Sequence, residues 1–416
     1  MKSMITMISF WIGALTFLGC QNSPIIDEPL PCIWNCDTFQ PEIVWEMNLS
    51  FNDAFALSRE PEFIDKQQVV FQNLFNNPAI VYRSFDRLTG QHIWDWAPEP
   101  ESAGTAASWR ENIFDEIYYD NLGKSLVSIN KNGETNWTYP VPDWADPGFA
   151  VLGGRIYASF KPFSPQDTSL VLLSSNIAQP AWDTLFYFSL RQTKDGTMVN
   201  LLPPSLFVNS GGDSLLIFAI RTGHGAAPSN FNVQIKGFHL QKRQVLWEIE
   251  ALPGDFNCSI DQPVIHEGIM AFPGHTHLYG IDLNKGQILY QLPFPDGLLT
   301  TDFLKVGTTV YFLDQPGRLY QVNIPDGRLL RQYPYEYGGN TSFMAYFEHL
   351  LYFTSTGDGR LYAVDTRTGE KIWAERSPNR HVFGDASFIV SGVALDTVNR
   401  LLYTSDQVSA MCLRLP

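Results

Sequence analysis

Apolar and polar positions alternate along short segments of the chain from about residue 41 onward. In LYAVD, residues 361–365, successive side chains point to opposite faces, as a β-strand requires, and both faces are apolar. TRTG then supplies a turn, and EKIW, residues 370–373, resumes as a second strand that ends in a large aromatic side chain. The pattern predicts an antiparallel hairpin that is covered on both faces.

This hairpin recurs along the chain. The turn begins at a polar residue, and the second strand ends eight residues later at a large one. Such pairs are Asp86 and Trp94, His239 and Trp247, Asp282 and Tyr290, Asn323 and Arg331, and Asp365 and Trp373, with Asn130 and Trp137 one residue shorter. The pattern is weaker around Trp182. Apart from one interval of 65, these ends are 41–45 residues apart. A period near 42, with four short strands per unit, is typical of β-propeller blades.

The turn residues have predictable roles. An aspartate that opens the turn can accept hydrogen bonds from the next backbone N–H groups, as we expect for Asp86, Asp282 and Asp365. A glycine near the end of the turn can adopt the positive φ that closes it. These glycines are Gly90, Gly286, Gly327 and Gly369.

The two ends of the chain predict how the ring closes. Residues 400–416, RLLYTSDQVSAMCLRLP, supply inner strands but stop before a final aromatic strand. Residues 42–49, EIVWEMNL, form an aromatic strand around Trp45 with no partner before it. Pairing the two would complete one mixed blade and remove the exposed edges. The sequence therefore predicts an all-β, eight-bladed propeller of four-stranded antiparallel blades, closed by its N-terminal strand.

The unit A-V-D-x-x-T-G-x-x-x-W, residues 363–373, resembles the PQQ-like repeat of eight-bladed propellers. That family includes the quinoprotein dehydrogenases and the outer-membrane assembly lipoprotein BamB. The resemblance covers about residues 41–416 and is weakest in the third unit. It implies that the repeat tryptophans pack between neighbouring blades. These are Trp94, Trp137, Trp247 and Trp373.

The same resemblance raises the question of catalysis. The dehydrogenases carry two adjacent cysteines over the cofactor, and a Glu, an Asn and an Asp around a Ca²⁺ ion. This chain has no adjacent cysteines, and we find no positions that match the other three. It also lacks a GxSxG, HExxH or phosphate-binding glycine motif. We therefore expect no cofactor and no enzymatic activity.

The N-terminus has the pattern of an export signal. Lys2 precedes an apolar stretch, residues 4–18, that is short for a membrane span and leads to Cys20. FLGC is similar to the lipobox of bacterial lipoproteins, whose cysteine is acylated, although an ordinary signal peptide is the alternative. We expect a lipoprotein-type signal over residues 1–20, lipidation at Cys20, and a Pro-rich, polar tether over residues 21–40.

The remaining cysteines fit an exported protein. Cys32 and Cys36 lie close together and would form a small disulfide in an oxidising compartment, because CIWNC lacks the CxxC spacing of redox and zinc sites. Cys258 and Cys412 are expected to be buried single thiols. We expect the protein to be anchored by lipid in the cell envelope, on the outer membrane.

The net charge of the chain narrows the class of molecule that it can bind. The formal net charge is −15, and an acidic chain repels phosphate backbones, so we expect no nucleic-acid partner. The expected partners are envelope proteins or a glycan or peptide ligand, bound by a monomer. A BamB-like accessory role in outer-membrane protein assembly is what the resemblance implies.

Long connections predict a binding rim. APEPESAGTAASWRE, KPFSPQDTS and RTGHGAAPSNFN are enlarged and would share one face of the ring; extra length also falls in NLLPPSLFVNSGG. Neutral insertion is the alternative. Trp109, Trp144 and Phe231 are candidate stacking platforms for a carbohydrate or peptide. His224, His275 and His277 would lie on the same rim of neighbouring blades. They are either polar rim residues or, in a second hypothesis, ligands for Zn²⁺ or Cu²⁺ in a metal-binding enzyme.

Overall fold

The chain divides into residues 1–38 and a second unit, residues 39–416. The computed structural model describes parts of the second unit only. They are residues 41–49, 57–58, 61–74, 80–98, 113–121, 125–140, 145–160, 169–178, 181–189, 197–224, 231–255, 258, 263–298, 302–338, 342–379, 387–388 and 392–416. The predicted signal and tether, with Cys20, Cys32 and Cys36, lie outside the described residues.

Within these residues the strands form eight antiparallel sheets, the blades. Blade one contains β2 (Leu57–Ser58), β3 (Glu62–Phe63), β4 (Gln68–Leu74), β5 (Ile80–Asp86) and β6 (His92–Trp96). Blade two contains β7 (Ile113–Phe114), β8 (Ile117–Asn121), β9 (Ser125–Asn130) and β10 (Thr135–Pro140). Blade three contains β11 (Ala145–Leu152), β12 (Arg155–Phe160), β13 (Ser169–Asn176) and β14 (Asp183–Ser189). Blade four contains β15 (Thr197–Leu201), β16 (Ser205–Val208), β17 (Ser214–His224), β18 (Phe231–His239) and β19 (Gln244–Ile249).

The other four blades follow the same meander. Blade five contains β20 (Val264–His266), β21 (Ile269–Pro273), β22 (His277–Asp282) and β23 (Gln287–Pro293). Blade six contains β24 (Leu304–Val306), β25 (Thr309–Leu313), β26 (Arg318–Asn323) and β27 (Leu329–Glu336). Blade seven contains β28 (Ala345–Phe347), β29 (Leu350–Thr354), β30 (Arg360–Asp365) and β31 (Lys371–Arg376). Blade eight contains β32 (Ala394–Asp396), β33 (Leu401–Ser405), β34 (Ser409–Arg414) and β1 (Ile43–Asn48).

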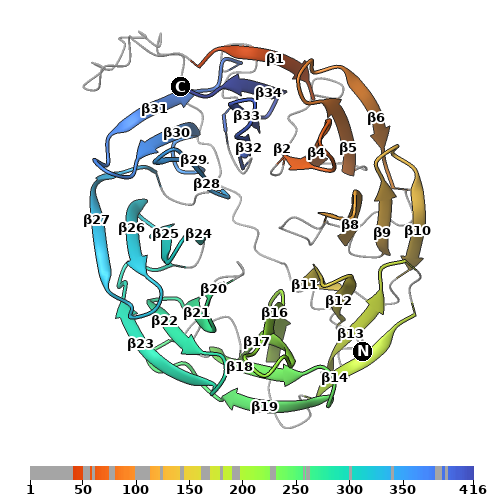
Figure 1. The fold of residues 1–416 in the computed structure, drawn as a ribbon, viewed down its shortest axis with the longest axis vertical. Coiled ribbons are helices and arrows are strands. Elements are labelled where there is room, and N and C mark those ends of the chain that lie inside the picture. Colours follow the sequence, from red (N-terminus) through yellow and green to blue (C-terminus); the bar gives the residue numbers. More distant parts are fainter. Residues whose placement is uncertain are drawn as a thin grey trace, which may run out of the picture. The chain divides into compact units, whose positions relative to one another are not determined.

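The blades stand around a ring, with the first strand of each near the centre and the last at the periphery (Figure 1). The predicted closure is confirmed, because β1 pairs with β34 and places Trp45 opposite Cys412. The predicted eight-bladed, all-β fold is confirmed with it. Blade three, whose sequence pattern is weak, is a four-stranded antiparallel sheet, and blades one and four each add one short strand to the same four-stranded path.

The cores of the molecule lie between blades. Each of eight clusters of buried apolar side chains joins two neighbouring sheets. One cluster, for example, joins Ile217 and Ile235 of blade four to Met270 and Ile281 of blade five. A sheet with two apolar faces can bury both only when it stands between two others, and the ring provides this for every blade.

The turn between the last two strands repeats a set of hydrogen bonds. In blade one, the Asp86 carboxylate accepts the N–H groups of Leu88 and Thr89 at 3.0 and 2.8 Å. In blade seven, Asp365 accepts the N–H of Arg367 at 2.8 Å. In each of these turns, the side chain of the first residue accepts backbone N–H groups of the residues that follow, which stabilises the turn.

The aromatic side chain of the outer strand contacts the same turn in the next blade. Trp247 Nε1 donates a hydrogen bond of 2.8 Å to the carbonyl of Leu283, the residue after Asp282. Four further donors make the equivalent bond: Trp45 to Arg87, Trp94 to Lys131, Trp137 to Ile177, and the Tyr290 hydroxyl to Ile324, at 2.8–3.0 Å. Trp373 is buried in the cluster between blades seven and eight, with its ring centroid 5.7 Å from that of Tyr352.

The turn glycine completes this contact between blades. Gly286 has φ +65°, and a Cβ there would lie 2.5 Å from the ring of Trp247. Gly90 has φ +70°, and its Cβ would lie 2.7 Å from the ring of Trp45. Two features therefore favour glycine at these positions: the positive φ of the backbone, and the close approach of the aromatic ring from the neighbouring blade.

Two positions depart from the sequence pattern. In blade six, Arg331 occupies the aromatic position, and its guanidinium donates to the Thr366 carbonyl at 2.9 Å, as the Tyr333 hydroxyl does at 2.7 Å. Trp182 precedes β14 and packs against Tyr139 of blade two, with centroids 5.4 Å apart. The contact from blade three to blade four is made by Phe186, which packs on Phe218 and Phe238.

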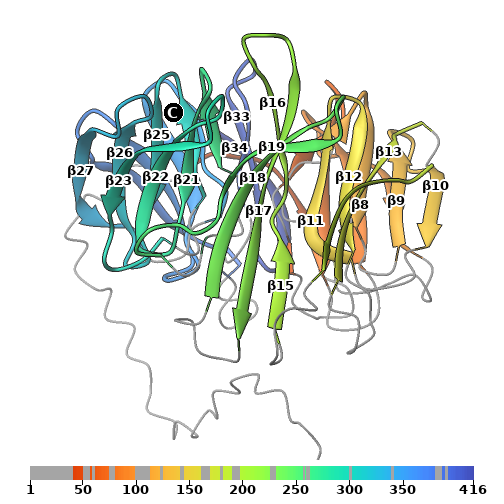
Figure 2. The same cartoon turned by 90° about the horizontal axis from the view of Figure 1, so that it is seen from below.

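Blade four corrects one expectation. The sequence pattern predicted extra loop length in NLLPPSLFVNSGG, residues 200–212, but six of these 13 residues lie in two short strands, β15 and β16, which both pair with β17. Pro203 and Pro204 interrupt the ladder because proline has no N–H to donate. With 11 and 9 residues, β17 and β18 are long, and they reach further toward one side of the ring than the strands of neighbouring blades (Figure 2).

Cys258 and Cys412 are free and buried. Burial raises the pKa of both thiols to about 12, so neither is a thiolate near neutral pH. No helix of a length and apolarity suited to crossing a bilayer occurs among the residues that the structure describes.

Candidate functional site

The predicted rim is described in part. Trp109 and Trp144 lie outside the described residues. His224 ends β17 and Phe231 begins β18, so their backbones flank the connection between the second and third strands of blade four, as the pattern predicted. Their side chains also lie outside what the structure describes.

His275 lies in the equivalent connection of blade five, between β21 and β22, and His277 is the first residue of β22. The Nδ1 atom of His277 lies 2.9 Å from the Thr276 hydroxyl and 3.4 Å from a carboxylate oxygen of Asp255. Among the side chains in the described ranges, no three His, Cys, Asp or Glu residues are grouped as a metal site would require. The three-histidine hypothesis includes His224, whose side chain is not among them.

The Asp255 carboxylate accepts three hydrogen bonds in this part of the rim. Its side chain is fully buried, and one oxygen accepts the Thr276 N–H at 2.8 Å and the Thr276 hydroxyl at 2.5 Å. The other oxygen accepts the Tyr279 hydroxyl at 3.0 Å. Burial and the adjacent carboxylate raise the pKa of Tyr279, so its phenol remains a donor.

Blades six and seven repeat this pairing of a rim aspartate with a tyrosine of the third strand. Asp314 accepts the Tyr320 hydroxyl at 3.0 Å and the Arg318 Nε at 2.7 Å. Burial, with Asp314 alongside, raises the pKa of Tyr320 to about 12. In blade seven the Tyr362 hydroxyl donates to Asp358. These three carboxylates all hold the rim connections in place.

Sequence reasoning missed these aspartate–tyrosine pairs. The available signal was the tyrosine in the third-strand motifs HLYG, RLYQ and RLYA, at residues 279, 320 and 362. The aspartates lie at different distances before it, so the pairing became visible only in the folded chain. In blades five to seven these mostly buried pairs tie the rim connections to the third strands.

A pocket of about 270 Å³ lies between blades seven and eight, where the ring closes. Its apolar lining includes Leu361, Phe388, Met411 and Leu413, and Glu375 adds a charged side chain. The volume is just below the range of about 300–1,000 Å³ for small-molecule sites, so it suits one or two side chains better than a large cofactor.

Comparison with known proteins gives one partial sequence match and extensive structural similarity. Residues 206–375 match the family model described as outer membrane protein assembly factor BamB. No curated protein sequence matches the chain. The family match runs from β16 to β31, which is most of blades four to seven.

Three solved structures illustrate the shared fold. The computationally designed Ika8 protein is 12% identical with a TM-score of 0.62, and the alignment covers 90% of this chain and 100% of Ika8. BamB from Moraxella catarrhalis is 11% identical with a TM-score of 0.56, covering 91% and 98%. Sqt1 from Saccharomyces cerevisiae is 11% identical with a TM-score of 0.61, covering 91% and 100%. At this level of identity the likeness concerns the fold.

Proposed function

Because the chain is an eight-bladed β-propeller of PQQ-like repeats, we propose that it acts as a non-enzymatic binding or scaffolding protein of the cell envelope. The match of residues 206–375 to the model of an outer-membrane assembly factor carries this proposal. The description of that family model names a role in assembly, and the match extends over most of blades four to seven.

The described rim supports binding by a preformed surface. The buried carboxylates of Asp255 and Asp314 are held by hydrogen bonds within their own blades. A surface fixed in this way loses little conformational entropy when a partner docks. In this proposal the partner contacts the connections between second and third strands, on the side toward which β17 and β18 extend.

The finer proposal is a BamB-like accessory role in the assembly of outer-membrane proteins. Deleting the gene in its native host should lower the amount of folded barrel proteins, measured by their heat-dependent mobility in gels. Cross-linked capture of the tagged protein from the same envelope should recover components of barrel assembly. Unchanged barrel proteins, together with capture of a transporter or a glycan-handling protein, would overturn the BamB-like role.

Lipid anchoring through Cys20 is a separate part of the proposal. Cys20→Ala should release the protein from the membrane fraction, because the acyl chains supply the membrane affinity. Cys258→Ala is the matched control, since that thiol is buried within the ring. Membrane association that persists in Cys20→Ala would favour an ordinary signal peptide followed by attachment through a partner.

A receptor for a peptide or carbohydrate is the second candidate function, and the pocket between blades seven and eight favours it. Leu361→Trp should fill the apolar side of that pocket. If a peptide or glycan mixture binds the native protein and binds Leu361→Trp equally well, the pocket is not the receptor site. Metal analysis of the purified protein tests the histidine alternative, which predicts about one equivalent bound.

A further inference from the structure

The pocket between blades seven and eight lies where β31 ends and β1 begins. These two outer strands follow one another along the periphery of the ring (Figure 1). Glu375 and Arg376, the last residues of β31, line the pocket on the side of blade seven, and Ile43 of β1 lines it on the side of blade eight. The buried side chains of Leu361 and Met411 are also part of its lining.

Other blades show which side chain normally stands at the position of Glu375. In each of them this position comes two residues after the large residue of the outer strand, and it pairs across the sheet with a residue of the third strand. The equivalent residues are apolar or aromatic. The pairs are Trp96 with Tyr82, Tyr139 with Leu126, Ile249 with Ile235, and Leu292 with Leu278, against Glu375 with Leu361 in blade seven.

These apolar side chains fill the space between neighbouring blades. Trp96 packs against the cluster between blades one and two, and Tyr139 against the cluster between blades two and three. Ile249 and Leu292 do the same at the next two interfaces along the chain from blade four. In blade seven the carboxylate of Glu375 takes this place, and a pocket of about 270 Å³ lies beside it. The pocket is therefore space that an apolar side chain fills elsewhere in the ring.

Glu375 departs from the repeat at a cost. Its side chain is half-buried, and a carboxylate loses solvation when it lies in an interface that is otherwise apolar. Positions that break the pattern of their own fold in this way are expected at functional sites, where binding rather than packing determines the residue.

We propose that this pocket accepts one large apolar side chain from an extended segment of a partner protein, with a basic residue beside it that pairs with Glu375. The inference rests on the receptor function proposed above for the same pocket. The equivalent interfaces indicate the chemistry of the inserted group, because each is filled by an aromatic or aliphatic side chain that projects from a peripheral strand.

Charge indicates the neighbouring residue of the partner. Glu375 is half-buried and Arg376 is exposed, so water screens the arginine more than the carboxylate. A cation that approaches the pocket is therefore attracted by Glu375 more strongly than it is repelled by Arg376. The formal net charge of −15 also favours a cationic segment over an anionic one.

The test uses labelled synthetic peptides of about eight residues, the length of a strand, rich in Thr and Val. The first peptide has Tyr at its centre followed by Lys; in the second Ala replaces the Tyr, and in the third Glu replaces the Lys. Binding to the purified full-length protein is measured by fluorescence polarisation. The Tyr–Lys peptide should bind at least about tenfold more tightly than the Ala–Lys peptide, because a large apolar group is buried. It should also bind more tightly than the Tyr–Glu peptide.

Variants of Glu375 separate the two parts of the proposal. Glu375→Leu restores the apolar side chain of the other blades, so it should weaken binding of the Tyr–Lys peptide at least about tenfold and raise the midpoint of urea unfolding. Glu375→Gln keeps the size of the side chain and removes its charge. It should keep the preference for Tyr over Ala and lose the preference for Lys over Glu.

Glu370→Leu is the matched control, because it removes the same charge from an exposed turn residue of the same blade. It should bind the Tyr–Lys peptide like the native protein. Equal binding of the Tyr–Lys and Ala–Lys peptides, or equal binding of the Tyr–Lys peptide to the native protein and to Glu375→Leu, would overturn the inference. A higher urea midpoint in Glu375→Leu without peptide binding to the native protein would also overturn it, since Glu375 would then mark only a packing defect.

The receptor function itself is tested separately. If Leu361→Trp weakens binding of the peptide or glycan mixture but the Tyr–Lys peptide does not bind the native protein, the pocket is a receptor site for a different ligand. In that case the inference fails and the receptor function stands. If neither the mixture nor the Tyr–Lys peptide binds the native protein, both fail.

Discussion

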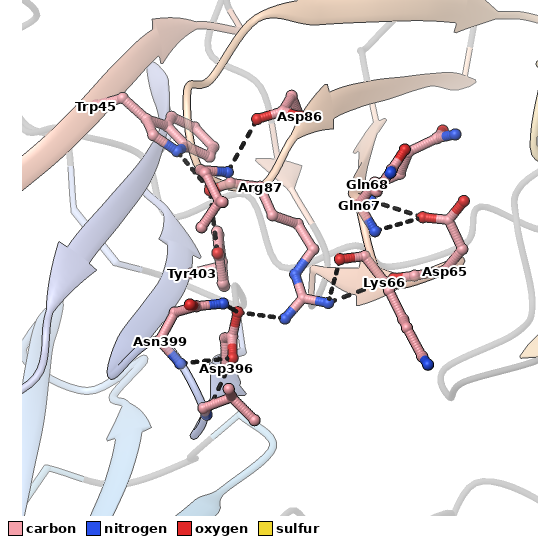
Figure 3. A network of polar contacts seen from close by, with 12 residues as sticks. Trp45, Asp65, Lys66, Gln67, Gln68, Asp86, Arg87, Asp396, Asn399 and Tyr403 are labelled. Atoms are coloured by element: carbon pink, nitrogen blue, oxygen red, sulfur yellow. Dashed lines mark hydrogen bonds and ion pairs between the residues drawn. The ribbon is translucent and has the colours of Figure 1, made fainter.

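The interface between blades four and five and the interface between blades eight and one are built from the same repeat, yet they differ in their polar content. Both place a tryptophan against a turn glycine and bond its indole to the next turn, Trp247 to Leu283 and Trp45 to Arg87. At the regular interface Leu283 is part of an apolar cluster. At the closure the equivalent residue is Arg87, whose guanidinium forms a buried ion pair with Asp396 of blade eight (Figure 3).

The difference shows that the same repeat can form an apolar interface between blades and an interface that contains a buried ion pair. Between blades four and five all contacting strands are close in sequence, whereas in blade eight only β1 is close in sequence to blade one. The closure joins residues more than 300 positions apart, such as Arg87 and Tyr403, at a separation of 316. Because the loop that this contact closes is long, forming it costs more chain entropy than forming a contact between blades that follow each other in the sequence.

Removing the closing strand should have the largest effect. A chain that starts at residue 50 lacks β1, leaves β34 as an exposed edge and loses the buried Trp45. We expect a loss of more than about 5 kcal/mol in the free energy of unfolding, because a large aromatic side chain and a full strand ladder are lost. Thermal unfolding followed by calorimetry measures this, with a chain that starts at residue 41 as control. An unchanged transition would contradict the mixed blade.

The turn glycines should show that both interfaces use the same packing. Gly286→Ala places a Cβ against Trp247 at a φ of +65° and should cost about 2–4 kcal/mol. Gly90→Ala, against Trp45, should cost a similar amount. Gly307 is the matched control, because its φ is +60° but nothing lies within 4 Å of its Cβ.

Gly307→Ala should therefore cost only about 1 kcal/mol, from backbone strain. Chemical unfolding of the three variants separates the two contributions. If all three lose the same stability, the close approach of the tryptophan rings does not matter.

The tryptophan hydrogen bonds should distinguish the two interfaces. Trp247→Phe leaves the Leu283 carbonyl without the indole donor, whereas Trp45→Phe leaves the Arg87 carbonyl with the Tyr403 hydroxyl at 3.0 Å. We expect Trp247→Phe to cost about 1 kcal/mol more than Trp45→Phe, the net value of one hydrogen bond. The measurement is the free energy of unfolding in urea. The opposite order would show that the second donor does not compensate.

Much of this fold could be predicted from the sequence, because the same pattern of strand and turn residues recurs in most of the blades. The spacing of Asp282, Gly286 and Tyr290 indicates a blade without reference to any other part of the chain. Closure could be predicted because EIVWEMNL and the last strands each lack a partner. In blade four, by contrast, β15 and β16 lie on either side of Pro203 and both pair with β17. No local sequence pattern predicts this shared pairing.

The candidate site was less predictable for a physical reason. Rim contacts such as Asp255 with Tyr279 join residues 24 positions apart, and the spacing changes from blade to blade. Arg87 and Asp396 each look ordinary in sequence, as a turn arginine and a strand-end aspartate. Their pairing depends on closure of the whole ring, so only the three-dimensional arrangement reveals it.

Lowering the pH should change the stability least of the conditions proposed here. It should still distinguish Asp396 at the closure from Asp365 in a regular turn. The hydrogen bond and charge of Arg367 lower the pKa of the Asp365 carboxyl from its ordinary value. At Asp396, burial alone would raise the pKa, but hydrogen bonds from Asn399 and the charge of Arg87 outweigh it, so this pKa is also lowered.

A carboxyl whose pKa is lower in the folded state binds more protons when unfolded. The stability it contributes is therefore complete above the unfolded value and is lost as the pH falls through the folded one. Asp365→Asn and Asp396→Asn should each flatten the decline of unfolding free energy below about pH 4. Arg367 is exposed and Arg87 is buried, so about 1 M salt, with a Debye length near 3 Å, should weaken the Asp365 effect more than the Asp396 effect. Equal sensitivity to salt would mean that the closure pair is solvated like a surface pair.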